Sequence, residues 1–535
     1  MIGRHPEANA EPHLDLERTE FDVLIVGSGF GGGTVAYALS RAGLKVLLVE
    51  RGGWPARDDK DWNGRAILLD GRYRGETPIG VRQSGAAAEV DTYPNAVVGG
   101  NSIFFGGAAL RLRATDFARW PITYADLEPH YAQAESLLEV HGRAGDDPCE
   151  PPRSGDYPYA PAPLSAPARR IAEAARALGM HPFHIPIAIN HAGPREPRCI
   201  NCFTCDGFPC RIGAKNDVTQ TALAKADPAN LAVVARVLAT RVVERDGRIV
   251  ALEAINLDSR DSGRRLTLRA RLFVLSGGAI GSPALMLRSG LAARDASGTL
   301  GRYLMRHCNA MMGYLFPFRT NPEHVNHKQI CITDGYESVR EADGTALGVI
   351  QDMCMPPREV VRALGPRGFR WAAAVSAERI QTLLCIAEDE PQADNAVTLS
   401  AERKDAFDLA VANVRHEYTE ADTRRRDALV RTARRVLRRA GGLVGKKRLI
   451  DSFSHAVGTA RMGATPETGA LSPECRFWAY PNLFVVDGSF MPTSGGVNPS
   501  LTITANAFRV AAQIRQDFGA LTLAPSSSPV GKLPA

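Results

Sequence analysis

Four cysteines lie within the twelve-residue stretch CINCFTCDGFPC, at positions 199, 202, 205 and 210. Their spacing, C-x2-C-x2-C-x4-C, places thiols two residues apart, as in many ligand sets of iron–sulfur clusters and zinc. The same residues could instead belong to a structural loop, either as free thiols or as a disulfide. An iron–sulfur cluster on Cys199, Cys202, Cys205 and Cys210 would indicate a protein that passes electrons on. The spacing alone leaves these alternatives open.

A second candidate site is a glycine turn near the start, in FDVLIVGSGFGGGTVAYALSRAGLKVLLVERGG. Gly27, Gly29 and Gly32 fit G-x-G-x-x-G between a buried-strand pattern and a helix pattern. The first glycine allows a tight turn, the second lets the backbone approach a pyrophosphate, and the third lets helix and strand pack closely. Glu50, followed by Arg51, ends the next strand and is placed to accept hydrogen bonds from a ribose. The stretch predicts a dinucleotide site without choosing between NAD and FAD.

These residues need a sheet to position them, and two later apolar runs supply further strands. RLFVLSGGAIGSP runs into glycines, and NLFVVDGSF ends in Asp487 and Gly488. A helix pattern follows over residues 498–518. Glycine pairs at 99–100 and 106–107 also let the backbone approach a flat or charged group. The pattern predicts a doubly wound α/β sheet that meets its ligand at several strand ends.

Four stretches besides the glycine turn resemble the glucose–methanol–choline (GMC) family of FAD-dependent oxidoreductases. They are VVGGNSIFFGGAALRL (97–112), GGAIGSPALMLRSGLA (277–292), SHAVGTARMG (454–463) and NLFVVDGSFMPTSGGVNPSLTITANAFRVA (482–511). Their order and spacing match the family from about residue 20 to residue 517, although Ala292 stands where a glycine is usual. The resemblance implies an α/β fold. A Rossmann-like FAD-binding domain would be joined by a second, substrate domain built on an antiparallel sheet.

The resemblance also implies which residues hold the cofactor. Val237 matches the position that meets adenine through its backbone. Phe104 stands where some relatives carry the histidine that bonds covalently to FAD, so non-covalent FAD is expected, and Phe105 replaces a common asparagine. The implied cofactor-binding residues are Gly27, Gly29, Gly32, Glu50, Arg51, Gly99, Gly100, Asn101, Gly106, Gly107, Val237, Gly278, Asp487, Gly488, Asn498, Pro499 and Thr502.

Oxidation of an alcohol by a flavin requires loss of a proton from the hydroxyl and transfer of a hydride to flavin N5. Histidine suits the first task because its pKa lies near working pH. His455, in SHAVGTARMG, matches the family's catalytic histidine. Asn498 matches the second catalytic position, where members carry histidine or asparagine. The resemblance thus implies His455 as general base and Asn498 as hydrogen-bond partner of the substrate oxygen.

The segment WPITYADLEPHYAQAE resembles the pyranose-oxidising branch of the family and several bacterial dehydrogenases. It favours a sugar or glycoside substrate, oxidised at a secondary ring hydroxyl. The alternatives are an aromatic or aliphatic primary alcohol, and a non-redox lyase on the same fold. The electron acceptor would be oxygen, a quinone or a protein. Many members carry a cysteine-rich loop ahead of a G-A-K sequence like that at 213–215, so the four cysteines are expected to be structural, with no metal site.

With 535 residues, the chain is expected to form more than one domain. The FAD-binding domain would comprise residues 1–150, 226–300 and 451–520, and the substrate domain 151–225 and 301–450, before a disordered tail at 521–535. The net charge of +6 argues only weakly for nucleic-acid binding. Neither a signal-peptide pattern nor a membrane-spanning stretch is evident, so the expected location is cytoplasmic. The oligomeric state is not indicated.

Three further features have weaker patterns. Residues 416–442 are rich in arginine and predict a helix whose charged face meets solvent. The runs ALGVIQDM and RWAAAVSAERIQTLLCIAEDEP suggest strands of the substrate-side sheet. His307, His324 and His327 lack metal-ligand spacing and are expected at the surface.

Overall fold

The computed structural model describes residues 15–522 except 84–88, 203, 259–261, 324, 326–327, 337–345, 355–357, 365–367 and 369. Its first sheet is five-stranded and parallel throughout, in the order β18-β10-β1-β2-β6. Most of its side chains are apolar and fully buried, as expected for strands covered on both faces. The predicted parallel sheet of an α/β fold is confirmed. Its strands are β1 (Phe21–Val26), β2 (Val46–Glu50), β6 (Leu231–Ala235), β10 (Ala270–Leu275) and β18 (Leu483–Val485).

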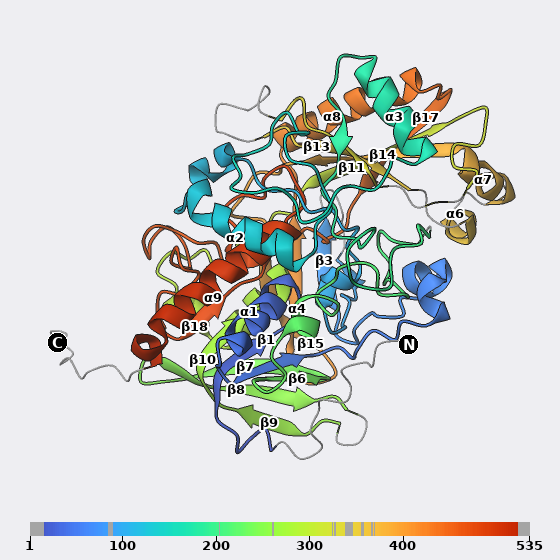
Figure 1. Ribbon diagram of the computed structural model, residues 1–535. Coiled ribbons are helices and arrows are strands. Elements are labelled where there is room, and N and C mark those ends of the chain that lie inside the picture. Colours follow the sequence, from blue (N-terminus) through green and yellow to red (C-terminus); the bar gives the residue numbers. More distant parts are fainter. Residues whose placement is uncertain are drawn as a thin grey trace.

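Helices α1, α2 and α9 pack together beside this sheet, and the short α4 contacts α1 (Figure 1). Their bounds are α1 (Phe30–Arg41), α2 (Tyr124–Leu137), α4 (Ala222–Lys225) and α9 (Ser500–Thr522). α9 extends two residues into the segment expected to be a disordered tail, and the rest of that tail lies outside the described residues. Among the described residues, no helix combines the length and apolar character needed to cross a membrane.

A three-stranded antiparallel sheet, β7-β8-β9, contacts β2 and β10 of the parallel sheet and lies at the bottom of Figure 1. Its strands are β7 (Val237–Arg245), β8 (Arg248–Asn256) and β9 (Arg265–Leu268). A four-stranded sheet has the order β15-β16-β3-β4, in which only the β16–β3 pair is parallel. These strands are β3 (Ile79–Gln83), β4 (Val90–Thr92), β15 (Ala396–Lys404) and β16 (Ala410–His416), and helix α5 (Gly278–Arg288) contacts the last two.

The expected antiparallel sheet is confirmed: it has six strands in the order β17-β11-β14-β13-β12-β5. Helices α3 (Ala166–Arg176) and α8 (Glu420–Arg439) lie above it at the top of Figure 1. Together they enclose a separate apolar core that includes Met312, Leu383 and Leu437. The strands are β5 (Phe183–His184), β11 (Cys308–Leu315), β12 (Ile330–Ile332), β13 (Val349–Met353), β14 (Ile380–Ala387) and β17 (Val444–Ile450).

Two sequence predictions for this part of the chain need correction. The run ALGVIQDM does contain a strand, but the first part of RWAAAVSAERIQTLLCIAEDEP forms helix α7 (Arg370–Ser376), since alanine favours helix. Helix α6 (Arg358–Leu364) precedes it. In α8 the exposed arginines follow the prediction, yet Arg425 and Arg426 are buried. Arg425 is buried because it pairs with Asp422 and Glu390. The proposed division into domains stays a prediction.

The start of α1 packs so tightly that only glycine fits. A Cβ at Gly32 would lie 2.0 Å from the carbonyl oxygen of Gly27, and one at Gly31 would lie 2.2 Å from that of Val486. Ser276, just after β10, accepts a hydrogen bond at its Oγ from the Gly32 backbone N–H at 2.7 Å. These contacts fix the N-terminus of α1 against the carboxyl ends of β1, β10 and β18.

Gly32→Ala is expected to destabilise the protein by about 1–3 kcal/mol, because the new methyl group overlaps a backbone oxygen that cannot move away cheaply. Gly29→Ala is the matched control, since its methyl group would meet no heavy atom of the chain within 4 Å. Thermal unfolding of both cofactor-free variants measures the difference. Equal melting temperatures would contradict this account of the glycine pattern.

Candidate active site

Glu50 ties the glycine turn to the end of β2. Its Oε2 accepts hydrogen bonds from the Ser28 backbone N–H at 3.1 Å and Oγ–H at 2.8 Å, and its Oε1 accepts one from the Gly52 N–H at 3.0 Å. The Ser28 Oγ also accepts from the Gly99 N–H at 2.8 Å. The turn, the predicted ribose acid and the 97–107 segment therefore meet at the carboxyl edge of the parallel sheet.

Two glycines at this edge face open space. A Cβ at Gly29, which caps α1, or at Gly278, the first residue of α5, would meet nothing of the chain within 4 Å. Gly278 has φ +81° and donates its N–H to Asp487 Oδ2 at 2.9 Å. Two helix N-termini thus present backbone N–H groups beside open space, an arrangement suited to phosphates. These residues fit the FAD that the sequence implies.

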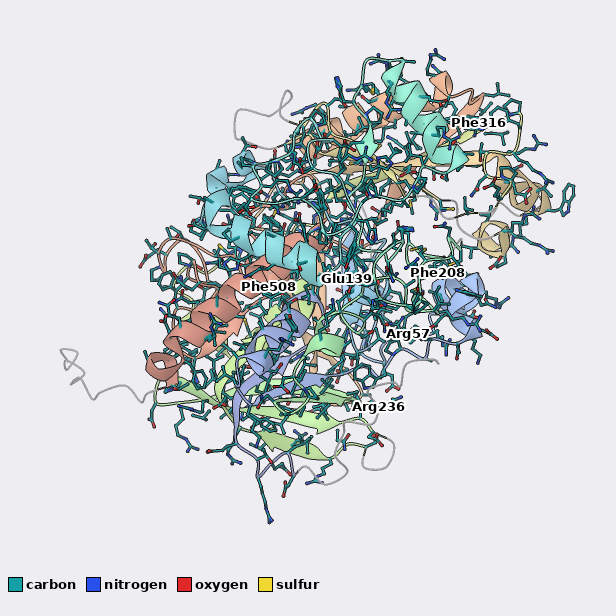
Figure 2. All side chains as sticks on the ribbon, viewed as in Figure 1. Arg57, Glu139, Phe208, Arg236, Phe316 and Phe508 are labelled. Atoms are coloured by element: carbon teal, nitrogen blue, oxygen red, sulfur yellow. The ribbon has the colours of Figure 1, made fainter. Side chains whose placement is uncertain are left out.

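Val237 lies at the other end of this edge, where β7 begins. Ala235 pairs with Glu50, and the Arg236 N–H donates to the Gly52 carbonyl at 3.1 Å. Arg236, labelled in Figure 2, adopts φ +58°, and its guanidinium lies over Gly53. Val237 is therefore two residues from the partner of Glu50, and its backbone contact to adenine stays a prediction.

The remaining predicted cofactor residues occupy different environments. Gly99, Gly100 and Gly107 adopt positive φ. Asn101 is exposed on the short 3-10 helix η4 (Gly100–Ile103). Thr502 is fully buried, and its hydroxyl oxygen lies 2.8 Å from that of Tyr131. Burial lowers the pKa of Arg51. The others are buried in the connecting segments or at helix starts: Gly106, Asp487, Gly488 and Pro499.

His455 and Asn498 are brought together, although 43 residues separate them. Asn498 Nδ2 lies 3.4 Å from His455 Nε2, and an amide nitrogen can only donate, so the histidine nitrogen accepts. Asn498 sits two residues before α9, and His455 lies between β17 and the turn that contacts η8 (Gly488–Phe490). The two predicted catalytic residues thus form one polar site.

Two residues of this site were missed by sequence reasoning. Gln351, on β13, donates from Nε2 to Asn498 Oδ1 at 2.7 Å and is fully buried. Its Oε1 has no hydrogen-bond partner within the described part of the chain. The other is His307, for which the surface prediction is wrong: it is only 1% exposed, and its Nδ1 lies 2.9 Å from His455 Nδ1. No local pattern marks either residue. His324 and His327 lie outside the described residues.

The pKa of His455 is lowered well below 6.5. Burial is the main cause, electrostatic repulsion from His307 and Lys328 adds to it, and Asp389 opposes it. The side chain is half-buried in the structure. A neutral imidazole that can accept a proton is therefore the resting form at neutral pH.

Lys328 is a buried cation near this site. It is 5% exposed, and its Nζ lies 2.6 Å from Asp206 Oδ2. A Cβ at Gly106 would touch both groups, at 2.6 Å from Nζ and 2.5 Å from Asp206 Oδ1. The ion pair therefore covers the second glycine pair of the 97–107 segment.

The cysteine loop packs beside that segment. The Gly207 N–H donates to the Phe104 carbonyl at 2.8 Å, and buried Lys215 donates to the carbonyls of Cys205 and Phe208 at 3.1 and 2.6 Å. Arg57 donates to the Cys210 carbonyl, and Figure 2 labels Arg57 and Phe208 in this region. All ten cysteines lie among the described residues, and none of them forms a disulfide. In the parts of the chain that the structure describes, no group of three or more His, Cys, Asp and Glu side chains could hold a metal ion.

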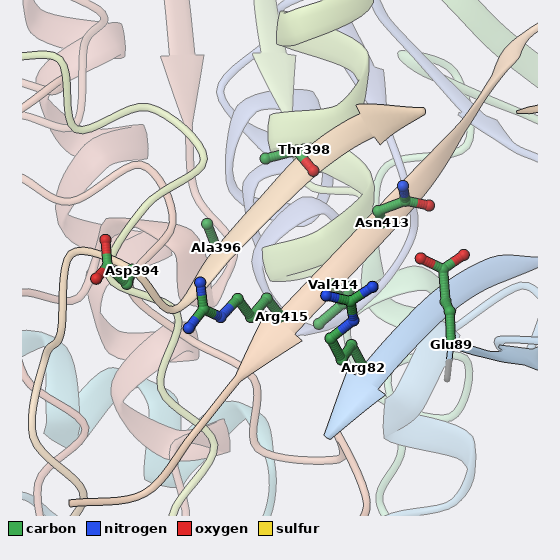
Figure 3. Close-up of a pocket in the computed structure, with 8 residues that line it drawn as sticks. All are labelled: Arg82, Glu89, Asp394, Ala396, Thr398, Asn413, Val414 and Arg415. Atoms are coloured by element: carbon green, nitrogen blue, oxygen red, sulfur yellow. The ribbon is translucent and has the colours of Figure 1, made fainter. Parts of the chain in front are cut away.

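A surface pocket of about 320 Å³ lies elsewhere, on the four-stranded sheet (Figure 3). None of its lining residues belongs to the site built from His455 and Asn498. They are Arg82, Glu89, Asp394, Ala396, Thr398, Asn413, Val414 and Arg415. Charges of both signs line this pocket, and its lining includes neither the glycine turn nor the predicted catalytic residues.

Comparison with known proteins agrees with this geometry. The GMC oxidoreductase family models match residues 81–309 and 391–507, and a model of an NAD(P)-binding Rossmann-like domain matches residues 25–63. Paromamine 6'-oxidase of Streptomyces fradiae is 31% identical over 96% of this chain and 96% of that protein. 6'''-Hydroxyparomomycin C oxidase of Streptomyces lividus is 30% identical over 97% of this chain and 96% of that protein.

Among solved structures, pyridoxine 4-oxidase from Mesorbium loti shares the fold, with a TM-score of 0.66 at 20% identity over 93% of this chain and 99% of that one. The sequence matches extend over nearly the whole chain and include both halves of the site. The chain belongs to the GMC oxidoreductase family and is an FAD-dependent oxidoreductase that acts on the CH–OH group of alcohols.

Proposed function

We propose that the protein oxidises a hydroxyl group of a sugar or glycoside, with His455 as general base and Asn498 as hydrogen-bond donor to the substrate oxygen. The observation that carries the proposal is the 3.4 Å contact between His455 Nε2 and Asn498 Nδ2. An acceptor and a donor side by side can take the hydroxyl proton and hold the oxygen that loses it.

His455 acts through its unprotonated Nε2, which accepts the proton of the substrate hydroxyl. Negative charge then develops on the substrate oxygen. Asn498 has its Oδ1 engaged by Gln351, so its Nδ2 hydrogens are directed to His455 and to that oxygen. A donor fixed in place before the reaction costs little reorganisation, which is the main source of such stabilisation.

FAD would be held by the glycine turn, Glu50, the α5 N-terminus and the segment from Asp487 to Pro499. When bound, the flavin supplies the acceptor for the hydride from the alcohol carbon. Phe104 offers no nucleophile for a covalent bond to it, which supports non-covalent binding.

The substrate class is supported by the two similar oxidases, whose names give an aminoglycoside as substrate. Both names include a 6 position of the sugar. Product analysis must therefore distinguish oxidation of an exocyclic hydroxyl at C6 from oxidation of the secondary ring hydroxyl suggested by the sequence. The names also favour oxygen as electron acceptor over a quinone or a protein. A cytoplasmic location remains part of the proposal.

His455→Ala is expected to lower kcat by about 10²- to 10⁴-fold, the range for loss of a general base, while FAD stays bound. The measurement is sugar- or glycoside-dependent peroxide formation, together with the flavin content of the purified variant. His141→Ala is a matched control, because His141 is also buried but contacts neither His455 nor Asn498. Wild-type turnover in the His455 variant would refute the assignment.

The pH dependence of kcat/KM should show an acid limb whose inflection lies below pH 6.5, because the pKa of the base is lowered in the folded protein. Activity is retained above this inflection and lost as pH falls through it, when His455 becomes protonated. The double variant K328M/D206N removes a nearby cation together with its carboxylate partner. Its inflection should move to higher pH, and an unchanged profile would exclude Lys328 as a cause.

Denaturation of the purified protein should release all of its flavin, with no iron in stoichiometric amount. The visible spectrum before and after dithionite, with an iron assay on the same sample, measures both. A broad brown absorbance with iron would instead support a cluster at Cys199, Cys202, Cys205 and Cys210.

In Gly29→Ala the FAD dissociation constant should rise, since the methyl group projects into the space beside the α1 N-terminus.

A further inference from the structure

The ring of His307 lies between a backbone carbonyl and His455. Its Nε2 is 2.8 Å from the Gly495 carbonyl oxygen and 3.2 Å from that of Ser494. Carbonyl oxygens only accept, so Nε2 must carry a hydrogen. Burial lowers the pKa of His307, which favours the neutral ring. A neutral ring with hydrogen on Nε2 has its lone pair on Nδ1.

That lone pair determines the state of His455. The two Nδ1 atoms are 2.9 Å apart, so His455 Nδ1 must be the donor to His307. In a neutral His455 the hydrogen on Nδ1 leaves Nε2 without one. The contact on the other side of the His455 ring requires the same tautomer. Asn498 donates its Nδ2–H to His455 Nε2, because the Asn498 Oδ1 already accepts a hydrogen bond from Gln351.

We infer that His307 is a positioning residue that fixes the tautomer of His455, so that the base presents an unprotonated Nε2 to the substrate. The inference rests on the proposed function of His455 as general base. The opposite tautomer would place two lone pairs face to face at the His307–His455 contact and two N–H groups face to face at the Asn498 contact.

The backbone of His307 is held at both ends. Its φ is +64°, a conformation that a residue with a side chain adopts only at a cost. Buried Asp389 accepts the consecutive N–H groups of Arg306 and His307 at 2.8 and 3.0 Å. The Tyr418 hydroxyl donates to the His307 carbonyl at 2.8 Å. Backbone strain kept in place by dedicated partners is typical of a functional site.

During the reaction the proton taken by Nε2 makes His455 positively charged, while its Nδ1–H continues to donate to His307. No proton needs to pass to His307. Its role is to select the reactive form of the ring beforehand and to support the charged form afterwards, comparable to the residue that orients a catalytic histidine in hydrolases.

Two substitutions test this inference. His307→Phe keeps a ring but removes the acceptor, and should lower kcat roughly 10- to 1,000-fold with KM little changed, a smaller loss than the roughly 10⁴-fold for the aspartate that orients a hydrolase's histidine. His307→Asn offers its Oδ1 in place of Nδ1 and should recover most of the rate. His141→Phe is the matched control at another buried histidine and should leave kcat unchanged.

The spectroscopic readout is the nitrogen NMR of histidine-labelled protein, with and without FAD, with His455 assigned through its variants. A protonated Nδ1 and an unprotonated Nε2 in the wild type, changed in His307→Phe, would support the inference. A protonated Nε2 in the neutral wild-type ring would overturn it. Wild-type kcat in His307→Phe, or equal loss in both His307 variants with an unchanged His455 spectrum, would also overturn it. Full activity of His455→Ala would instead refute the proposed function.

Discussion

The close packing of α1 against the ends of β1, β10 and β18 is the constraint on which the rest of the structure depends. With no Cβ at Gly31 or Gly32, the helix backbone approaches the strand ends to within hydrogen-bond distance of Ser276. The chain after β18 is therefore fixed directly against the dinucleotide turn. That same stretch continues to the Gly495 carbonyl and to Asn498, so one packing requirement positions both the proposed cofactor cradle and half of the candidate active site.

The other half comes from the antiparallel sheet, and burial makes its geometry specific. His307 precedes β11, Gln351 lies in β13, and Asp389 follows β14. Leaving any of these polar groups unpaired would cost about 1–3 kcal/mol. The register of β13 against β14, in which Gln351 opposes Leu384, is therefore tied to a correct hydrogen bond at Asn498. The register of the sheet and the geometry of the candidate active site are therefore linked.

The sequence predicts this site only where the signal is local. The glycine turn and the stretches around His455 and Asn498 are recognisable because each motif is contiguous. His307 is different: its partner is 148 residues away, and the carbonyl that orients it is 188 residues away. Nothing in RYLMRHCNA distinguishes a surface histidine from one that fixes a tautomer. The helix in RWAAAVS was missed for a different reason, since apolar content outweighed alanine propensity in the prediction.

The cysteine loop shows how a chemically suggestive pattern can contribute through other residues. Burial raises the pKa of Cys199 to about 11 and raises that of Cys205 further, so both thiols stay protonated at neutral pH. What joins the loop to the site is the Gly207 N–H on Phe104 and the Asp206 carboxylate on Lys328. Lys215, beneath the loop, supplies the donors that its buried carbonyls need. The loop is therefore joined to the site through Phe104 and through the ion pair of Asp206 with Lys328, and these contacts involve no metal.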